Sequence, residues 1–370
     1  MGNKRSEANA MTKGKSGRKL GRILMSVFLG VVVLVFVAAI VFLILQVSGK
    51  NSLYSRADSS QMVSNLSEMA LAMNEEVPVE DDNWEEGDLR YNGVHYRYNA
   101  DILTFLFLGI DKKEEVQRVE EGIDGGQSDA IFLLVLNPHT KEIDVIGIPR
   151  DTVAELEVYD ENGRYLGQGE GQITLQHGYG DGAELSCERS MAAVSRLFYG
   201  LPIHGYCAIN MGAIPLLNDA VGGIEVVALE TLKLNGRTVK EGETVHLQGE
   251  ASYDYLHSRD INSFNSAGGR LQRQKQYLMA YAGAVIDTVK SDITFPVTLY
   301  NTLIKYMVTD ISVDEVSYLA GQALSYHFSD ENMFILAGET AVGRRDFEEF
   351  HVNEQALYDL IINVFYEEVE

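Results

Sequence analysis

The residues best suited to chemistry in this sequence are arginines that recur at two points of an acidic chain. They lie in the runs Ile148-Pro149-Arg150-Asp151-Thr152 and Arg270-Leu271-Gln272-Arg273-Gln274. The 370 residues hold 54 Asp and Glu against 30 Lys and Arg, a formal net charge of -24. This balance excludes a general basic surface for nucleic acid. Clustered arginines on such a chain indicate a local anion site, for which phosphate or pyrophosphate fits best.

Arg150 follows a proline, which places it at the end of a predicted strand. Pro149 fixes its own backbone and has no N–H to give to a sheet. We therefore expect the Arg150 side chain to leave the sheet at its edge and to bind phosphate through two N–H groups. Asp151 either orients Arg150 or caps the segment that follows.

The later arginines open a predicted helix. Arg270, Arg273 and Gln274 stand at positions i, i+3 and i+4, hence on one face near the helix N-terminus, where backbone N–H groups also favour anions. Arg259 lies a short distance upstream. An ordinary surface helix that carries arginines is the alternative, and Arg273 in particular could be structural.

Two carboxylates are placed to meet close to these arginines. Asp111 ends one predicted strand and Asp129 begins the next, so they can face one another at a sheet edge. Such a pair can hold Mg²⁺ or Mn²⁺ against phosphate oxygens. Because aspartate at a strand end is also an ordinary turn residue, both interpretations stay open on the residues alone.

An α/β domain with a central sheet covered on both faces is expected to position these residues. Short β-branched runs bounded by turn residues predict strands, and periodic apolar residues predict helices. The predicted strands cover residues 102–110, 130–136, 143–148, 205–209, 224–228 and 333–337, and the predicted helices cover residues 184–199, 211–220, 270–289 and 353–364.

The N-terminal part of the chain indicates a membrane anchor. Residues 23–45 are apolar apart from Ser26 and Gly30, and this length is sufficient for a transmembrane helix. Basic residues precede it, so the positive-inside rule predicts a cytoplasmic tail over residues 1–22, a transmembrane helix over 23–47 and the rest of the chain outside the cell. A cleaved signal peptide is the alternative, but its apolar core is usually shorter.

Residues 48–98 are interpreted as an extracellular stalk and residues 99–370 as one extracellular domain. The stalk contains an acidic run over residues 75–88, which is typical of a solvated spacer. Cys187 and Cys207 either pair in an oxidising exterior or stay as two buried thiols. We favour the thiols, because one bridge is no framework for a domain of this size.

Six short motifs follow one another between residues 100 and 290. They are Leu108-Gly109-Ile110-Asp111, Gln127-Ser128-Asp129, Ile148 to Thr152, Ala220-Val221-Gly222-Gly223-Ile224, Tyr255 to Arg259 and Arg270 to Gln274. No single motif is specific. The ordered set, behind one N-terminal anchor, resembles the LytR-CpsA-Psr (LCP) family.

The resemblance implies an exported α/β domain with a central mixed sheet. Such a domain holds a polyprenyl pyrophosphate in an apolar tunnel and transfers its glycopolymer to peptidoglycan, with the membrane, the lipid-linked glycan and peptidoglycan as partners. The implied metal ligands are Asp111 and Asp129, the implied catalytic residues are Arg150 and Asp111, and the implied pyrophosphate contacts are Arg150, Arg259, Arg270, Gln274, Gln127, His257 and Arg273.

Some positions depart from the family pattern. The family usually has Arg where this chain has Gln127 and His257, Arg or a similar residue at Lys113, and Asp-x-Gly-Arg where this chain has Ala-Gly-Gly-Arg at 267–270. A neutral amide and an imidazole bring no obligatory charge to a phosphate. The chain is therefore either a divergent transferase or a member that binds its substrate without efficient transfer.

Two other functions remain alternatives to glycopolymer transfer. The first is hydrolysis of the polyprenyl pyrophosphate, with the same metal and arginines and with water as the acceptor. The second is a lipid-binding or attenuator-type regulatory role. A cytoplasmic tail of residues 1–22 is too short for a DNA-binding fold, which weighs against the regulatory role.

Overall fold

The structure is a computed structural model that describes residues 44–56, 62, 65–66, 84–85, 88–120, 123–258, 266–292, 294–323, 325–343 and 346–369. The chain divides into two compact units. The first unit comprises residues 1–52 and 312–324, and the second comprises residues 53–311 and 325–370. All of the candidate site residues belong to the second unit.

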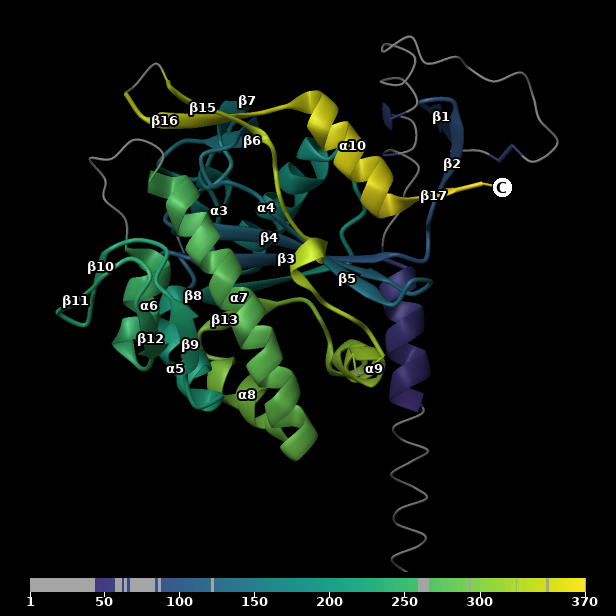
Figure 1. Cartoon of the computed structure of the whole chain (residues 1–370). Helices are drawn as coiled ribbons and strands as arrows, with labels where there is room; N and C mark the ends of the chain where they lie inside the picture. The colour runs from purple at the N-terminus through teal and green to yellow at the C-terminus, as the bar shows by residue number, and fades with distance from the viewer. Residues whose placement is uncertain are drawn as a thin grey trace, which may run out of the picture. The chain divides into compact units, whose positions relative to one another are not determined.

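A six-stranded mixed sheet forms the centre of the second unit (Figure 1). Its strand order is β13 (Met307–Thr309), β8 (Gly205–Asn210), β3 (Leu103–Ile110), β4 (Ser128–Asn137), β5 (Glu142–Gly147) and β14 (Met333–Ile335). Strand β3 runs antiparallel to β4 and parallel to β8, and β14 runs parallel to β5. The predicted α/β class with a central mixed sheet is confirmed.

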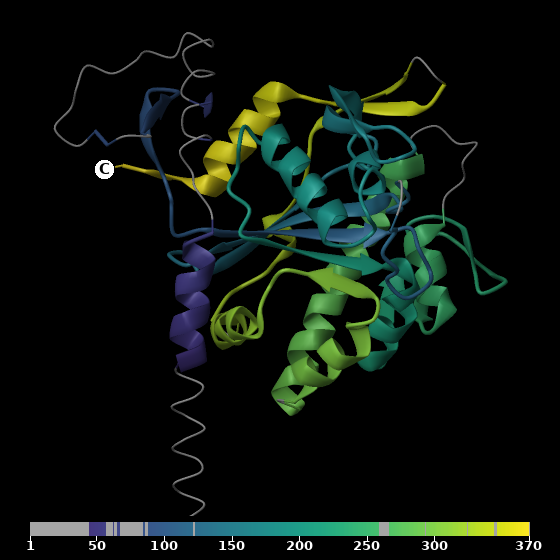
Figure 2. The same ribbon diagram turned by 180° about the vertical axis from the view of Figure 1, so that it is seen from behind.

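Helices cover both faces of this sheet, which is why its inner strands are apolar on both sides. Helices α4 (Glu184–Leu197) and α10 (Glu354–Phe365) lie on one side, and α7 (Ser266–Ser291) lies on the other (Figures 1 and 2). Leu106, Leu133 and Ile361 belong to one buried cluster and have no exposed surface. Cys187 and Cys207 are free and buried, and burial raises the pKa of both thiols.

A smaller core lies against α7. Strand β9 (Ile224–Val227) pairs with β12 (Thr244–Leu247), and β10 (Leu232–Leu234) pairs with β11 (Arg237–Val239). Helices α5 (Ile214–Ala220), α6 (Glu250–His257) and α8 (Phe295–Leu303) belong to the same part of the chain. Leu247, Tyr255 and Tyr277 are buried together there. Because α6 ends at His257, this small core determines where that imidazole lies.

Hairpins and short helices complete the second unit. These are β6 (Val153–Tyr159) with β7 (Tyr165–Gln172), β15 (Gly338–Val342) with β16 (Glu348–Val352), the three-stranded sheet of β1 (Leu89–Tyr91), β2 (Val94–Tyr98) and β17 (Tyr366–Glu368), and α3 (Leu175–Gly178), η1 (Met211–Ala213) and η2 (Asp330–Asn332).

The predicted helix over residues 211–220 is divided in the structure. It begins as the 3₁₀ turn η1 and continues as α5 from Ile214. Pro215 stands in the first turn of α5, where its missing N–H costs no helical hydrogen bond. The predicted single helix was therefore wrong at this point, although its end at Ala220 is correct.

In the first unit, residues 44–52 are helical and contact α9 (Val313–Ala323). The predicted tail over residues 1–22, residues 23–43 of the predicted anchor and much of the predicted stalk lie outside the described residues. Within the part of the chain that the structure describes, no helix combines the length and the hydropathy needed to cross a membrane.

Candidate metal and anion site

A β-bulge brings the two predicted metal ligands to one edge of the sheet. Strands β3 and β4 pair residue by residue until the register shifts between Gly109 and Ile110, opposite Asp129. A bulge re-aims the side chain of the extra residue. Asp111 directly follows β3, and its backbone N–H donates to the Gln127 carbonyl at 2.9 Å. Asp111 and Asp129 therefore meet where one strand ends and the next begins.

Asp129 is buried between two arginines. Arg150 Nη1 donates to Oδ1 of Asp129, and Arg270 Nη1 donates to Oδ2 at 2.7 Å. The side chains of Asp129 and Arg270 are 3% exposed, and that of Arg150 is 11% exposed. Like charges repel strongly away from water, so the shared carboxylate is what allows the two guanidiniums to converge.

Neighbouring side chains aim Arg150. Its Nη2 donates to the amide oxygen of Gln127, and its Nε lies 3.4 Å from Oδ1 of Asp151. The same Asp151 oxygen accepts from Gln172 Nε2 at 3.1 Å. Asp151 is followed by strand β6 and has no helix to cap, so the geometry supports its orienting role over the capping role.

Asp111 lies in a more open setting, beside His257. Its Oδ1 is 3.2 Å from Nε2 of His257, and the two side chains are 48% and 33% exposed. Asp111, Asp129 and His257 each offer one ligand atom, and these atoms all lie within 4.8 Å of one another. The family resemblance implied His257 as a pyrophosphate contact, whereas the structure places it with the two carboxylates.

Tyr253 and Lys113 stack behind His257. The rings of Tyr253 and His257 have centroids 4.9 Å apart and planes inclined by 17°, and Nζ of Lys113 lies 4.1 Å from the Tyr253 centroid. Burial, with a smaller contribution from the Asp111 carboxylate, raises the pKa of Tyr253 to about 12. The neutral phenol thus fixes the plane of the imidazole. Sequence reasoning missed Tyr253, although its i, i+4 spacing from His257 was a usable signal.

Arg273 faces the end of α6 and not Asp129. Its side chain is fully buried and donates to the backbone carbonyls of Tyr255 and Ser258, while its Nε lies 3.0 Å from Glu230. Burial lowers the pKa of Arg273, and the Glu230 carboxylate opposes that shift. Arg273 therefore holds the C-terminal end of α6, where His257 lies.

Gln274 also lies against the C-terminal end of α6. Arg259 lies outside the described residues. Gln274 is buried, with Nε2 3.4 Å from the Leu256 carbonyl of α6. The predicted residues that the structure brings together are Asp111, Gln127, Asp129, Arg150, His257 and Arg270. Arg273 and Gln274 lie behind this group, against α6.

The donor set at the sheet edge suits a divalent cation. Two carboxylates provide the hard oxygens that Mg²⁺ and Mn²⁺ prefer, and the imidazole adds a nitrogen of the kind that transition metals accept. Asp111 is half exposed, which leaves room for the water ligands that Mg²⁺ retains. The residues present therefore fit the predicted metal.

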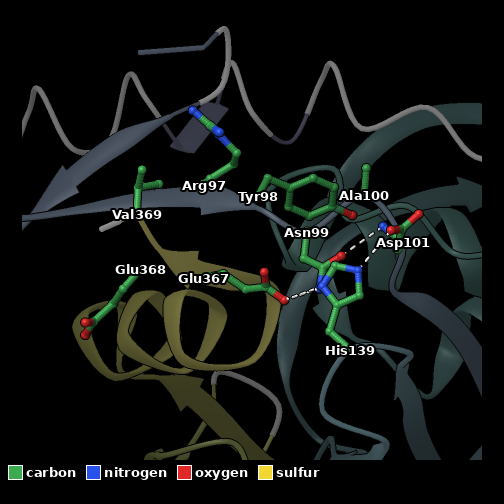
Figure 3. A pocket seen from close by; sticks show the side chains of 9 residues that line it. All are labelled: Arg97, Tyr98, Asn99, Ala100, Asp101, His139, Glu367, Glu368 and Val369. Atoms are coloured by element: carbon green, nitrogen blue, oxygen red, sulfur yellow. Dashed lines mark hydrogen bonds and ion pairs between the residues drawn. The ribbon is translucent and has the colours of Figure 1, made fainter. Parts of the chain in front are cut away.

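A polar pocket in the same unit lies between β2, the turn from β4 to β5, and β17 (Figure 3). His139 crosses it, with Nδ1 2.9 Å from Glu367 and Nε2 3.0 Å from Asp101. Glu367 and then Asp101 raise the pKa of His139. Arg97 points away from the imidazole (Figure 3). Because carboxylates and not converging guanidiniums surround His139, this pocket is a poor phosphate site.

Comparison with known proteins identifies a family for most of the chain. The sequence model of the LytR_cpsA_psr family matches residues 60–341. The polyisoprenyl-teichoic acid–peptidoglycan teichoic acid transferase TagU of Bacillus mycoides is 30% identical over 181 residues, which are 49% of this chain and 52% of that protein. The chain spans about half the length of the curated relatives it matches.

Solved structures share the fold. A crystal structure of a transcriptional regulator from Enterococcus faecalis superposes with a TM-score of 0.54 at 22% identity, over 71% of this chain and 86% of that one. The crystal structure of B. subtilis TagV gives a TM-score of 0.53 at 22% identity, over 71% and 95%. At these identities the likeness shows the central mixed sheet with its helices, and no more.

Proposed function

Because the chain belongs to the LytR-CpsA-Psr family, we propose that it is a membrane-anchored phosphotransferase that moves a glycopolymer from a polyprenyl-pyrophosphate carrier onto peptidoglycan. The observation that carries this proposal is the convergence of Arg150 and Arg270 on buried Asp129, beside Asp111 and His257. The name of the Bacillus mycoides relative, a transferase from polyisoprenyl-teichoic acid to peptidoglycan, supports both the donor and the acceptor.

In this proposal residues 23–47 cross the cell membrane once. Residues 1–22 lie in the cytoplasm, the stalk over 48–98 and the domain over 99–370 lie outside, and the lipid carrier is reached from the outer face. The apolar run over residues 23–45, which contains no charged residue, and the basic residues that precede it support this topology.

The two buried guanidiniums are the centre of the proposed pyrophosphate site. Asp129 keeps Arg150 and Arg270 together and aimed before any anion binds. Donors fixed in advance need little reorganisation when charge develops on the phosphoryl oxygens. Arg259 directly follows Ser258, which Arg273 holds in place, and completes the proposed set of arginines.

In the proposed reaction a muramic acid hydroxyl of peptidoglycan attacks the sugar-bearing phosphorus. A new P–O bond forms to peptidoglycan, the P–O bond to the carrier breaks, and polyprenyl phosphate leaves with the bridging oxygen and its electron pair. Arg150 and Arg270 spread the growing negative charge. Asp111 is the candidate base for the hydroxyl proton because it is exposed and offers one oxygen to the metal cluster, which leaves its other oxygen for the proton, whereas both oxygens of Asp129 already accept from arginines.

Asp111, Asp129 and His257 would hold a Mg²⁺ or Mn²⁺ ion, which as a Lewis acid would neutralise charge on the phosphate oxygens. Two of the residues that depart from the family pattern have roles that do not require a contact with phosphate. Gln127 accepts from Arg150 and so aims it, and Lys113 lies over the ring of Tyr253. This arrangement favours a divergent transferase over a member that only binds.

Hydrolysis would use the same residues with water as the acceptor, so the products decide between the two. The full-length chain in nanodiscs would be incubated with a lipid-linked glycan, Mg²⁺ and peptidoglycan oligomers, and the products identified by mass spectrometry. We expect a covalent glycan–peptidoglycan product together with polyprenyl phosphate. Free phosphorylated glycan alone would instead support the hydrolase.

Binding of the lipid-linked glycan without either product would support the lipid-binding role. Arg270→Ala should abolish the covalent product. The matched control is Arg56→Ala, which removes an exposed arginine that pairs with Asp310 at 3.0 Å and should leave product formation intact.

A further inference from the structure

Helix α9 has an apolar outer side and buries a carboxylate on its inner side. Val313 is 70% exposed and Val316 is 42% exposed, and Ala320 is also exposed. These residues stand at i, i+3 and i+7 and form one side of the helix, the apolar face of α9. Glu315, by contrast, has no exposed surface. The inner side of α9 therefore buries a carboxylate together with the ring of Tyr318, which is 9% exposed, whereas a surface helix of a soluble domain usually keeps its charges in water and its valines inside.

The carboxylates of α9 are turned toward the helical residues 44–52. Ser52 Oγ donates to Oε1 of Glu315 at 2.7 Å, and Ser48 Oγ donates to Oδ2 of Asp314 at 2.7 Å. The two acidic side chains of the first turn therefore have hydrogen-bond donors within the helix pair. Among the described residues of α9, Val313, Val316, Ala320 and Gly321 are exposed, and none of them carries a charge.

Two glycines let these helices touch. A Cβ atom on Gly49 would overlap the backbone of Asp314, and a Cβ atom on Gly321 would lie 2.6 Å from Nε2 of Gln46. Gln46 Nε2 also donates to the Ser317 carbonyl. Close backbone approach through small residues, joined by hydrogen bonds between helices, is typical of helices that associate in lipid.

The same contacts show which way the apolar face points. Along residues 44–52, Gln46 contacts Ser317 of α9 and Ser52 contacts Glu315. Successive residues of an α-helix are rotated by about 100°, so the apolar face of α9 is closer in rotation to Ser317 than to Glu315. Because Ser317 contacts Gln46 and Glu315 contacts Ser52, the apolar face points toward the residue-44 end of the neighbouring helix. Figures 1 and 2 show α9 end-on while residues 44–52 run along the vertical, so the two helices cross.

The chain before residue 44 indicates what this face meets. Residues 23–43 contain no charged side chain, and in the proposed topology they end at the outer membrane surface. We infer that α9 lies along that surface, with its apolar face on the lipid acyl chains. Its crossing of an upright helix matches the orientation of an interfacial helix. The inference rests on the proposed membrane anchor, and it gives the anchored chain a second contact with the bilayer.

A single fluorescent NBD label on Val316→Cys tests this inference. The full-length chain would be labelled and then reconstituted in vesicles of phosphatidylcholine and phosphatidylglycerol. Both native cysteines are buried in the protein and should compete little for the label. We expect a blue-shifted emission that lipids with quenching acyl chains reduce. The matched control is Val342→Cys, 62% exposed on β15, whose label should show neither effect. A label on Leu34→Cys in the predicted anchor is the reference for a position inside the lipid.

The labels separate two failures. If the label at residue 34 is quenched while that at 316 behaves like that at 342, α9 is not on lipid and the anchor stands. If the label at residue 34 also reports water, the anchor itself is wrong. As a second test, Val313→Asp with Val316→Asp should abolish lipid quenching of a label on Ala320→Cys without lowering the free energy of unfolding, because both valines are exposed. Persistent quenching there would overturn the inference.

Discussion

Two clusters in the second unit pair carboxylates with cationic side chains, and they differ mainly in burial. At the candidate site, the side chain of Asp129 is 3% exposed, and its partners Arg150 and Arg270 are 11% and 3% exposed. In the polar pocket, the side chain of His139 is 49% exposed, and its partners Asp101 and Glu367 are 62% and 45% exposed.

Burial determines what each cluster can do. Away from water, one missing partner leaves an uncompensated charge, so a buried pair resists removal but can bind a new ion of the right sign. In water, solvent and salt screen the same contact, and it contributes little either way. The cluster at Asp129 is thus suited to hold an incoming phosphate, whereas the cluster at His139 is suited to weak, pH-dependent stabilisation.

The largest expected effect on stability comes from removing the buried carboxylate charge. Asp129→Asn keeps the shape of the side chain but leaves two guanidiniums facing each other, and we expect the free energy of unfolding to fall by about 3–5 kcal/mol. Urea unfolding of the variant and of the unaltered chain measures this difference in the free energy of unfolding. Asp101→Asn is the exposed counterpart and should cost less than about 1 kcal/mol. Equal losses in the two variants would show that burial does not separate the clusters.

The arginines of the buried cluster should dominate substrate affinity. A hydrogen bond to a charged group is worth about 1.5–3 kcal/mol, so Arg150→Ala or Arg270→Ala should weaken binding of a polyprenyl pyrophosphate by about one to two orders of magnitude. Titration calorimetry gives the affinity, with Arg56→Ala as a control that should bind like the unaltered chain. Wild-type affinity in both site variants would refute the proposed phosphate site.

Substitutions at Asp111 and His257, on the open side of the site, should weaken Mg²⁺ binding without lowering the stability of the fold. Asp111→Asn and His257→Gln each remove one candidate ligand, and we expect the Mg²⁺ concentration that supports half-maximal transfer to rise at least about tenfold, or about 1.4 kcal/mol. Both side chains are a third or more exposed, so the free energy of unfolding should stay within about 0.5 kcal/mol. His351→Gln, an exposed histidine 3.4 Å from Glu349, is the control. An unchanged Mg²⁺ titration in both variants would make the pair structural.

Much of the fold was predictable because its central elements have strong local patterns. Strands β3 and β4 are runs rich in Leu, Phe, Ile and Val, β5 contains Ile143, Val145 and Ile146, and α7 and α10 have regular helical spacing. The hairpin of β6 and β7 was not predicted, since β7 contains Gly167, Gly169 and Gly171, and glycine is a poor strand former. Yet β7 ends at Gln172, which bonds to Asp151 beside Arg150.

The candidate site was predictable as a set of residues but not as an arrangement. Arg270 and Arg273 lie one turn apart on α7, and their spacing predicted one shared helical face, with a structural role left open for Arg273. In the structure Arg270 donates to Asp129, whereas Arg273 donates to the backbone carbonyls of Tyr255 and Ser258. Those partners come from tertiary packing of α6, which no local pattern in the helix encodes.

The smallest expected effect belongs to His139 and depends on pH. Its two carboxylate partners raise its pKa in the folded chain above the ordinary value of about 6.5. A raised pKa means that the folded state binds the proton more tightly, so the stabilisation is fully present below about pH 6.5 and is lost as the pH rises through the folded value. Because the imidazole is half exposed, screening should keep the contribution below about 1 kcal/mol.

The variant His139→Gln tests the pH-dependent stabilisation by His139 in urea unfolding at two pH values. At about pH 5.5 histidine is charged and the carboxylates remain ionised, and at about pH 9 histidine is neutral. The variant should be less stable than the unaltered chain only at the lower pH. A loss of the same size at both values would mean that His139 acts through packing and not through its charge. A loss of several kcal/mol at the lower pH would mean that this pocket is as well shielded from water as the cluster at Asp129, and the contrast between the two regions would fail.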